Sequence, residues 1–487
     1  MDGGCGEISD TGHIKSGLID SGSLGLFLDY YELTMAKADL DHSNMGVITE
    51  NYYVRKIPQG AYLISAGLEQ VIHFIKNFKV TEEDVEWLRS TSGRDFDNRF
   101  LEYLLDFSFR GDVYAVPEGT VVFPNEPIMN VTGPSPEVQL FETYILNVMN
   151  FQTLIAAKAS RIARAARGRD VVDFGARRAH GRDAAVMGAR AAFIGGATGS
   201  SLVMAGKIWG IPYVGTMAHK FIQDRVSELD AFRDYAESFP HNSILLIDTY
   251  DTLEGAKNAC IIGRELKKRG FELKGVRLDS GDLFELSKKV RVILDNEGLK
   301  SVKIFASSDL DEFVVDELIS AGAPIDGFGV GTRLITGANY NPLAKAGGVS
   351  ALNGIYKIAE RVERGRVIPK MKTTDDASKS TLPGRKQVYR RLVSREFVED
   401  IITLWDEKPK PERDWSPLLV PVIAKGKLVY DFPPISSIRK YAAEQLRMLP
   451  ERFKRLDQAD EYPVRISPQI KELRERLSKE HGEKGIA

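Results

Sequence analysis

Cysteine is almost absent from this chain of 487 residues, which contains only Cys5 and Cys260. Two distant cysteines make neither a disulfide framework nor a zinc site, and their scarcity fits a reducing compartment. Long apolar runs are missing as well, and none approaches the length of about 20 residues that a helix needs to cross a bilayer. The sequence therefore predicts a cytoplasmic protein with no membrane partner.

An excess of charge of either sign is also lacking. The chain has 66 Lys and Arg residues against 68 Asp and Glu residues, and its formal net charge is -2. Such a balance provides no broad basic field to attract DNA, RNA or an anionic membrane. We therefore expect no nucleic-acid partner, and any anion must be bound by a local site.

The length and the changing sequence pattern predict four parts, because 487 residues exceed one ordinary core. Residues 1–25 are rich in Gly, Ser and Asp, which predicts a flexible extension rather than a signal peptide. Residues 26–145 mix helical and β-rich segments and predict an α+β domain. Residues 353–487 are expected to form a C-terminal segment that packs in part on the N-terminal domain.

Strand-like and helix-like segments alternate over the remaining part, residues 146–352. Strands are expected to start near residues 171, 211, 244, 275, 302 and 325. This alternation predicts an α/β fold in which helices cover a parallel sheet. Six or more units without an obvious reversal favour a TIM-like barrel over an open sheet.

Polar residues follow each expected strand, where the loops of a β/α barrel build its active site. They are Asp173, Phe174, Arg177, Arg178 and His180; Thr216 and His219; Asp248 and Asp251; Arg277, Asp279, Ser280 and Asp282; Ser307, Ser308 and Asp309; and Gly329, Gly331 and Thr332. Any one of them has a simple explanation as a hydrated loop residue. Six such strand ends in a row indicate a site.

The residue types point to an anionic, phosphorylated ligand. Arg177 and Arg178 carry planar donors that suit phosphate or carboxylate, although an internal ion pair is an alternative for one of them. The glycines of GVGT at 329–332 leave backbone N–H groups free to cradle phosphate. Phe174 is able to stack on a flat ring.

The acids of DTYD (248–251) and LDSGD (278–282) have two interpretations. They are suited to hold Mg²⁺ on a polyphosphate or to bind sugar hydroxyls. They also precede helices, so capping is the alternative, and it applies more to Asp251 and Asp282 than to Asp248 and Asp279. His219 is either an acid, base or nucleophile, or a structural histidine.

Eight short motifs occur in a characteristic order: DYYELTMA, DFGARRAHG, VGTMAH, IDTYD, VRLDSGDL, SSDLDE, GFGVGT and TLPGRKQVYR. Together they resemble the motifs of nicotinate phosphoribosyltransferases, and the resemblance covers roughly residues 26 to 477. It implies a type II phosphoribosyltransferase fold, in which an irregular, incomplete α/β barrel lies beside an N-terminal α+β domain. It also implies a homodimer whose sites are shared across the interface.

The resemblance implies a reaction of NAD salvage. Nicotinate and phosphoribosyl pyrophosphate would give nicotinate mononucleotide and pyrophosphate, with Mg²⁺ on the phosphorylated substrates. ATP hydrolysis would be coupled to this transfer through a phosphohistidine at His219.

The same resemblance assigns roles to other residues. Tyr31 of the partner subunit and Phe174 would stack on the two faces of the pyridine ring, and Arg277 would face its carboxylate. Asp279, with Asp248 nearby, would contact the ribose or the metal. The remaining substrate-binding residues would be Arg177, Thr216 and Ser308, the 5′-phosphate residues Gly329, Gly331 and Thr332, and a further loop of Lys372 with residues 381–390.

The choice between acid and amide depends on the segment Gly195–Val203. It offers the hydroxyl groups of Thr198, Ser200 and Ser201 as donors to a carboxylate and contains no acid that would repel one. This favours nicotinate. The alternatives are a nicotinamide or quinolinate phosphoribosyltransferase, and a non-catalytic barrel that binds a phosphorylated metabolite.

Overall fold

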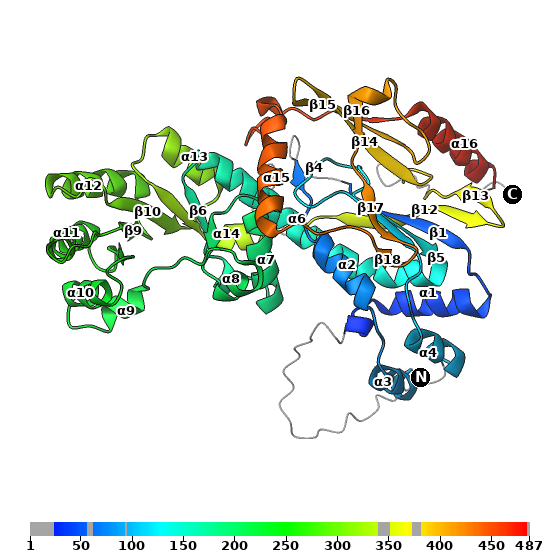
Figure 1. Ribbon diagram of the computed structural model, residues 1–487, viewed down its shortest axis with the longest axis horizontal. Coiled ribbons are helices and arrows are strands. Elements are labelled where there is room, and N and C mark those ends of the chain that lie inside the picture. The colour runs from blue at the N-terminus through cyan, green and yellow to red at the C-terminus, as the bar shows by residue number, and fades with distance from the viewer. Residues whose placement is uncertain (1–23, 56–61, 93–94, 339–350, 373–380, 485–487) are drawn as a thin grey trace.

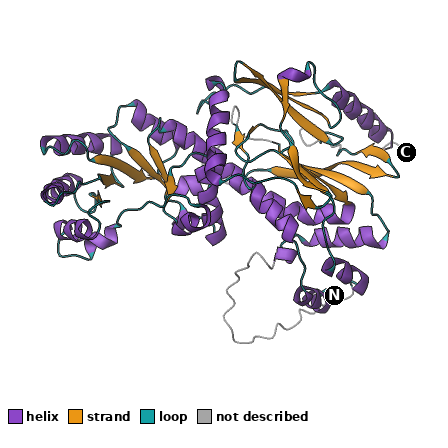
Figure 2. Cartoon of the chain, in the orientation of Figure 1, coloured by secondary structure: helices purple, strands orange, loops and turns teal. Residues whose placement is uncertain are grey.

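The computed structural model describes residues 24–55, 62–92, 95–338, 351–372 and 381–484. Two bodies lie side by side, with helices α6 (Glu142–Ala165) and α15 (Ile435–Met448) at their junction (Figure 1). One body carries a parallel sheet, and the other combines the N-terminal and C-terminal parts of the chain (Figure 2). The extension expected over residues 1–25 falls outside the described residues except for its last two.

The second body contains a seven-stranded sheet in the order β13-β12-β1-β5-β3-β17-β18. Its strands are β1 (Val47–Val54), β3 (Asp112–Ala115), β5 (Met129–Pro134), β12 (Gly354–Glu363), β13 (Arg366–Pro369), β17 (Val420–Ala424) and β18 (Lys427–Leu428). β12 runs antiparallel to β1 and places Tyr356 opposite Tyr52. Strands that follow residue 353 therefore complete a sheet begun by the N-terminal part of the chain.

Two smaller sheets and several helices surround this sheet. The strands are β16 (Trp415–Pro417), β14 (Lys386–Val393), β15 (Glu396–Leu404) and β19 (Val464–Ile466), and the pair β2 (Leu63–Ile64) and β4 (Val121–Val122). The helices are α1 (Tyr30–Asp41), α2 (Leu68–Asn77), α3 (Glu82–Thr91), α4 (Asn98–Leu105), α5 (Ser135–Val138) and α16 (Pro468–Lys484), with 3-10 turns at Leu24–Leu26, Gln139–Phe141, Glu412–Asp414 and Glu451–Phe453.

The first body is built on six strands in the order β7-β6-β11-β10-β9-β8. They are β6 (Asp170–Asp173), β7 (Gly199–Ser200), β8 (Ile244–Leu246), β9 (Gly275–Leu278), β10 (Lys303–Ser308) and β11 (Gly327–Val330), and every pairing is parallel. The strands are buried on both faces, as a sheet covered by helices requires: Leu245, Val276 and Ile304 are inaccessible to solvent.

Helices separate these strands in the expected alternation. They are α7 (Arg182–Ile194), α8 (Val203–Trp209), α9 (His219–Gln223), α10 (Glu228–Ser238), α11 (Thr252–Lys268), α12 (Leu283–Asn296), α13 (Glu312–Ser320) and α14 (Thr332–Ile335), with a 3-10 turn at Ala176–Arg178. Several begin with an acid that caps their first N–H groups. Asp251 accepts from Leu253 and Glu254, and Asp282 accepts from Glu285, so the capping interpretation holds for both.

A closed barrel is not shown by the structure. β11 pairs with β6, but β7 and β8 are the two end strands of the sheet. The strand expected from residue 211 is reduced to a single bridge between Ser200 and Tyr213, because Pro212 lacks the N–H that a longer ladder needs. Within the described ranges the chain is thus a mixed α/β protein with a parallel sheet that stays open between Tyr213 and β8.

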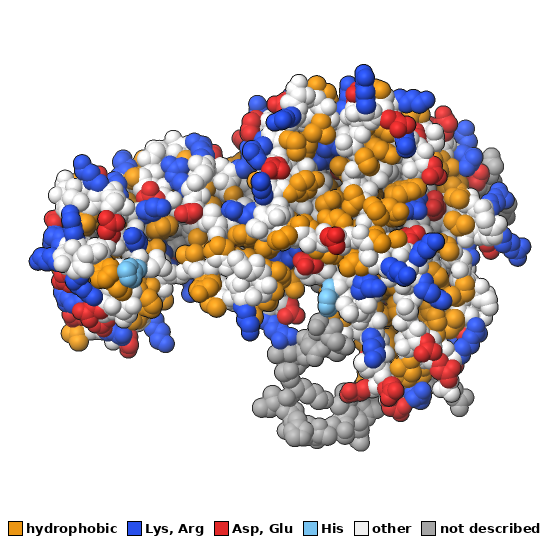
Figure 3. Space-filling model, viewed as in Figure 1, with side chains coloured by type: hydrophobic (Ala, Val, Ile, Leu, Met, Phe, Trp, Pro, Cys, Tyr) orange, Lys and Arg blue, Asp and Glu red, His pale blue; other side chains and the backbone are white. Residues whose placement is uncertain are grey.

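The surface agrees with the balanced charge of the sequence. Figure 3 shows basic and acidic side chains interspersed over the visible face, with no broad field of one sign. No helix in the described ranges is both long and apolar enough to cross a membrane.

Candidate active site

One edge of the parallel sheet collects the polar residues that the sequence singles out. Because all six strands are parallel, the loops that follow them open at the same edge. Phe174 follows β6, Asp248 follows β8, and Asp279 follows β9. Side chains that are 31 to 105 residues apart in sequence are thereby brought to one edge of the sheet.

A cavity of about 230 Å³ extends along the sheet from Asp170 and Ile244, at the starts of β6 and β8, to Phe174 at this edge. Its lining includes Phe174, Thr198, Thr216, Arg277 and Phe328. Gly329 makes room for the Phe174 ring, because a Cβ at position 329 would lie 2.4 Å from that ring. The polar groups of the lining are one cation, two hydroxyl groups and, at the far end, the carboxylate of Asp170. Near Phe174 the apolar walls and the cation suit a flat ring that carries a negative charge.

Arg277 is the cation of this cavity. Its Nη1 donates to Thr216 Oγ1 at 2.8 Å, and its guanidinium carbon lies 5.9 Å from the centre of the Phe174 ring. Its Nε is buried and has no hydrogen-bond partner within the described residues. Burial lowers the pKa of this guanidinium, an effect that the carboxylates of Asp279 and Asp248 oppose, and an arginine in this setting remains charged. The unused donor is available to an anionic ligand.

Asp248 and Asp279 are linked at the ends of neighbouring strands. Asp248 Oδ2 accepts from the backbone N–H of Asp279 at 2.8 Å and from the hydroxyl of Ser280 at 2.7 Å. Its Oδ1 is buried and unpartnered within the described part of the chain. Asp279 Oδ1 in turn accepts from the hydroxyl of Ser307. The two acids are therefore held in place, and Asp248 keeps one oxygen free.

His219 lies beside these acids at the start of α9. Its Nε2 is 3.5 Å from Asp279 Oδ2, and its Nδ1 is 3.1 Å from the hydroxyl of Thr249. The ring is partly exposed, with 39% of the side chain accessible. A histidine held at both nitrogens yet open to solvent is placed to exchange a proton or to accept a group. Thr249 was not predicted from the sequence as a site residue, although it lies inside the DTYD motif.

The residues that were predicted to bind phosphate lie along the same edge of the parallel sheet. Arg177 is exposed on the turn after β6. Its positive charge adds to the effect of burial in lowering the pKa of Arg277. Gly331 lies between β11 and α14, and Thr332 is the first residue of α14. Ser308 ends β10 with a φ of 143°, a backbone conformation that non-glycine residues rarely adopt and that is concentrated at functional sites.

Other expected residues are occupied elsewhere. Ser200 is buried and donates its hydroxyl to Asp173 Oδ2 at 2.8 Å, so this donor is not available to a ligand. Burial raises the pKa of the Asp173 carboxyl, and the hydrogen bonds from Ser200 and Gly175 oppose that rise. Thr198 lines the cavity, with its hydroxyl 3.2 Å from the carbonyl of Val171.

Tyr31 and the segment 381–390 lie in the other body. Tyr31 lies on α1 rather than beside Phe174 (Figure 1). Burial and the nearby carboxylates of Glu142 and Glu32 raise the pKa of its hydroxyl. Lys372 follows β13, and Arg390 is fully buried against Asp400 at 2.6 Å. One copy of the chain does not bring these residues to the cavity.

Models of a known family match most of the chain. The nicotinate phosphoribosyltransferase N-terminal domain matches residues 26–150, the nicotinate phosphoribosyltransferase family model matches residues 170–397, and the C-terminal domain matches residues 412–474.

Individual relatives give the same family. A nicotinate phosphoribosyltransferase of Mycobacterium tuberculosis is 42% identical over 448 residues, which is 91% of this chain and 92% of that protein. One from Bacillus subtilis is 39% identical and covers 94% of this chain and 97% of its own length. The crystal structure of human nicotinic acid phosphoribosyltransferase superposes with a TM-score of 0.79 at 25% identity, over 92% of this chain and 99% of that one. The chain therefore belongs to the nicotinate phosphoribosyltransferase family.

Proposed function

We propose that the chain transfers the phosphoribosyl group of phosphoribosyl pyrophosphate to nicotinate, with release of nicotinate mononucleotide and pyrophosphate. This is the activity named for its relatives, and the cavity supports it. The observation that carries the proposal is Arg277, a partly buried cation beside the Phe174 ring, next to the pair Asp248 and Asp279. An anionic aromatic ring and a phosphorylated sugar would meet there.

Nicotinate would lie against Phe174 with its carboxylate toward Arg277 and Thr216. The ring nitrogen then faces the edge where Asp248 and Asp279 stand. The ring nitrogen attacks the anomeric carbon of the ribose, and the bond from that carbon to pyrophosphate breaks. Positive charge develops on the ribose during this exchange. Positioning and charge stabilisation suffice for this step, and no protein nucleophile is needed at carbon.

Phosphate groups would be held by the residues around the cavity mouth. Arg177 provides a planar donor for pyrophosphate, and Ser308 ends β10 at the same edge of the sheet. Gly331 and Thr332 at the start of α14 offer backbone N–H groups to the 5′-phosphate. Gly329 lies within β11, where the absence of a side chain leaves room for the Phe174 ring.

Mg²⁺ fits the residues present. No group of three or more His, Cys, Asp and Glu side chains in the described ranges is arranged to hold a metal by itself. Mg²⁺ instead prefers one or two carboxylates together with substrate phosphates, and the unpartnered Oδ1 of Asp248 is such a ligand, with Asp279 adjacent. The ion would neutralise charge on the departing pyrophosphate.

His219 would couple ATP hydrolysis to the transfer. The unprotonated nitrogen of the neutral imidazole attacks the γ-phosphorus of ATP, the bond to the departing ADP oxygen breaks, and the other ring nitrogen releases its proton to solvent. Water later attacks the phosphohistidine and releases inorganic phosphate, which restores the free ring. Asp279 at 3.5 Å and Thr249 at 3.1 Å orient the ring for this exchange. The phosphorylated ring would lie next to the acids that handle pyrophosphate, so turnover of ATP biases the transfer toward product.

A second copy of the chain would complete the site. Tyr31 is exposed on α1 together with Tyr30 and Met35, and exposed apolar side chains in a group indicate an interface. In a homodimer, α1 of the partner would cover the open edge of the parallel sheet and supply the second stacking face. The gap between Tyr213 and β8 is consistent with an irregular, incomplete barrel of this family type.

Nicotinate is preferred over nicotinamide because Arg277 places a positive charge in the cavity. Asp170, the one carboxylate of the lining, begins β6 at the far end from Phe174, about 13 Å away at the usual rise of a strand. The test is product formation with phosphoribosyl pyrophosphate, Mg²⁺ and one of nicotinate, nicotinamide or quinolinate, each with and without ATP. Nicotinate mononucleotide formed faster with ATP is the expected result. Turnover of another pyridine would reassign the substrate, and no turnover would leave a binding protein.

A further inference from the structure

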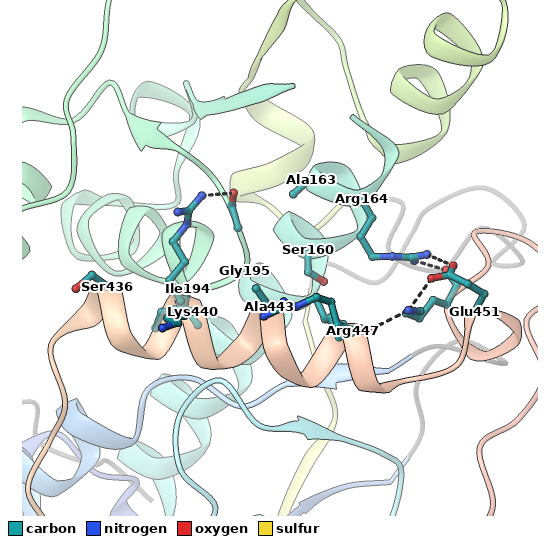
Figure 4. Close-up of a pocket in the computed structure, with 14 residues that line it drawn as sticks. Ser160, Ala163, Arg164, Ile194, Gly195, Ser436, Lys440, Ala443, Arg447 and Glu451 are labelled. Atoms are coloured by element: carbon teal, nitrogen blue, oxygen red, sulfur yellow. Dashed lines mark hydrogen bonds and ion pairs between the residues drawn. The ribbon is translucent and has the colours of Figure 1, made fainter. Parts of the chain in front are cut away.

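A second and larger cavity, of about 590 Å³, lies between α15, the last turns of α6 and the loop that follows α7 (Figure 4). The end of α6 leads into β6, and Gly195 and Gly196 lead into β7. The cavity therefore adjoins the amino ends of the strands, at the edge opposite Phe174 and Asp279. The proposed reaction makes no use of it.

The lining of this cavity is strongly cationic. Its charged members are Arg164, Arg439, Lys440, Arg447, Lys454 and Glu451. Five cations against one carboxylate leave an excess of four positive charges in a chain whose net charge is -2. Glu451 is shared, because Arg164 lies 2.8 Å from one of its oxygens and Lys454 lies 2.7 Å from the other.

Three of the cations remain available to a ligand. Lys440 and Arg447 project from one side of α15, with Ala443 between them (Figure 4). Lys440 makes no hydrogen bond or ion pair in the described part of the chain, and Arg447 has an exposed pair with Glu444 at 3.7 Å. Arg439 donates its Nη2 to the carbonyl of Gly196 at 3.1 Å, while its Nε is buried and unpartnered among the described residues.

The rest of the lining is apolar and spacious. Ala163, Ile194, Ala443 and Leu446 form this part of the wall. A volume of about 590 Å³ falls within the range of roughly 300–1,000 Å³ that small-molecule sites occupy, and it exceeds what inorganic phosphate fills. The cavity thus offers charge for several phosphate oxygens and an apolar surface for an organic group.

We propose that this cavity is a second, non-catalytic binding site for a nucleoside di- or triphosphate. Arg439, Lys440 and Arg447 would hold the phosphoryl groups, because arginine and lysine are the residues that bind phosphate most strongly. The apolar wall would cover the base. A free inorganic polyphosphate would contact the same cations but would leave the apolar wall uncovered. The two ligands are therefore distinguishable by their affinity.

The experiment is isothermal titration calorimetry of the full-length protein with ADP and, separately, with inorganic tripolyphosphate. The test variant is Lys440→Ala with Arg447→Ala, since both residues are exposed and their removal leaves the core intact. The matched control is Lys267→Ala with Lys268→Ala, which removes the same charge from the exposed end of α11. Thermal unfolding confirms that each variant is folded.

We expect two ADP molecules per wild-type chain, one beside His219 at the proposed catalytic site and one here. The test variant should weaken one of them at least tenfold, whereas the control variant keeps both. A single ADP that the test variant loses would support this site and count against the proposed catalytic one. Unchanged binding in the test variant, or an equal loss in the control, overturns the proposal. Tripolyphosphate binding as tight as ADP would overturn the assignment to a nucleotide.

Discussion

Asp248 accepts the backbone N–H of Asp279 at 2.8 Å, across the ends of strands β8 and β9. It also holds the hydroxyl of Ser280 at 2.7 Å, so the start of the loop after β9 depends on one carboxylate. Three residues further along, Asp251 performs a different task, because it caps helix α11. The same four-residue motif thus contains one acid that organises the site and one that stabilises a helix.

Replacing each of these acids by alanine should separate the two tasks. Asp248→Ala is expected to lower kcat by about 100-fold, because Asp279 loses its anchor and the metal loses a ligand. Asp251→Ala should cost about 1 kcal/mol of stability through the lost cap and leave kcat within about twofold. Steady-state kinetics and urea unfolding of both variants test this. Equal effects of the two substitutions on kcat would contradict the assignment.

Gly329→Ala should damage the aromatic face of the cavity. The added Cβ would lie 2.4 Å from the Phe174 ring, so the ring must move. We expect the KM for nicotinate to rise by about tenfold, because one stacking contact with the ring is lost. A double-mutant cycle with Phe174→Ala provides the control. Once the ring is absent, Gly329→Ala should add little, and a full additional loss would show that position 329 acts independently of Phe174.

His219→Ala should uncouple ATP from the transfer. Without the imidazole there is no acceptor for the γ-phosphoryl group, so ATP hydrolysis is lost, while Phe174, Arg277 and the two acids still support a slow, ATP-independent transfer. Release of inorganic phosphate and formation of nicotinate mononucleotide are measured in parallel. Wild-type ATPase activity in this variant would remove His219 from its proposed role.

Mixed dimers should reveal whether Tyr31 acts across an interface. Tyr31→Ala and Asp279→Ala chains are each expected to be nearly inactive. After mixing and subunit exchange, a heterodimer would contain one site with both an intact Asp279 and an intact partner Tyr31, so part of the activity should return. Exchange is verified with differently tagged chains. Proven exchange without recovery would mean that Tyr31 serves its own chain.

Glu32 should make stability depend on pH. It is fully buried on α1, where burial raises its pKa from an ordinary value of 4.5 to about 7, although hydrogen bonds from Thr143 oppose this. The folded chain therefore binds a proton that the unfolded chain has released, and folding loses stability as the pH rises from about 4.5 to about 7.

The variant Glu32→Gln has no titratable group at this position and isolates the contribution of Glu32 to the pH dependence of stability. The stability of Glu32→Gln relative to wild type should rise across that pH window by on the order of 3 kcal/mol and stay level above it. Urea unfolding at several pH values measures it. Glu102→Gln, at an exposed position on α4, is the control and should show no such trend. A pH-independent difference for Glu32→Gln would contradict the raised pKa.

The sequence by itself determined the alternation of strands and helices and the polar residues at strand ends. Both are local properties, because burial on two faces requires apolar runs and a loop at the sheet edge admits polar side chains. The positions of β6, β8, β9, β10 and β11 were predictable for this reason. The family was also readable from motifs such as GTMAH and RLDSGDL, and the relatives confirm it.

Tertiary structure alone decided how these residues are used. Nothing near Ser200 in sequence shows that Asp173 accepts its hydroxyl, and nothing near Arg277 shows that Thr216 receives one of its N–H groups. The two-residue strand β7 is too short to leave a period in the sequence, and the cationic cavity exists because α15 packs beside α6 and α7. Such contacts join segments dozens to hundreds of residues apart, so they are set by the packing of whole elements rather than by any local pattern.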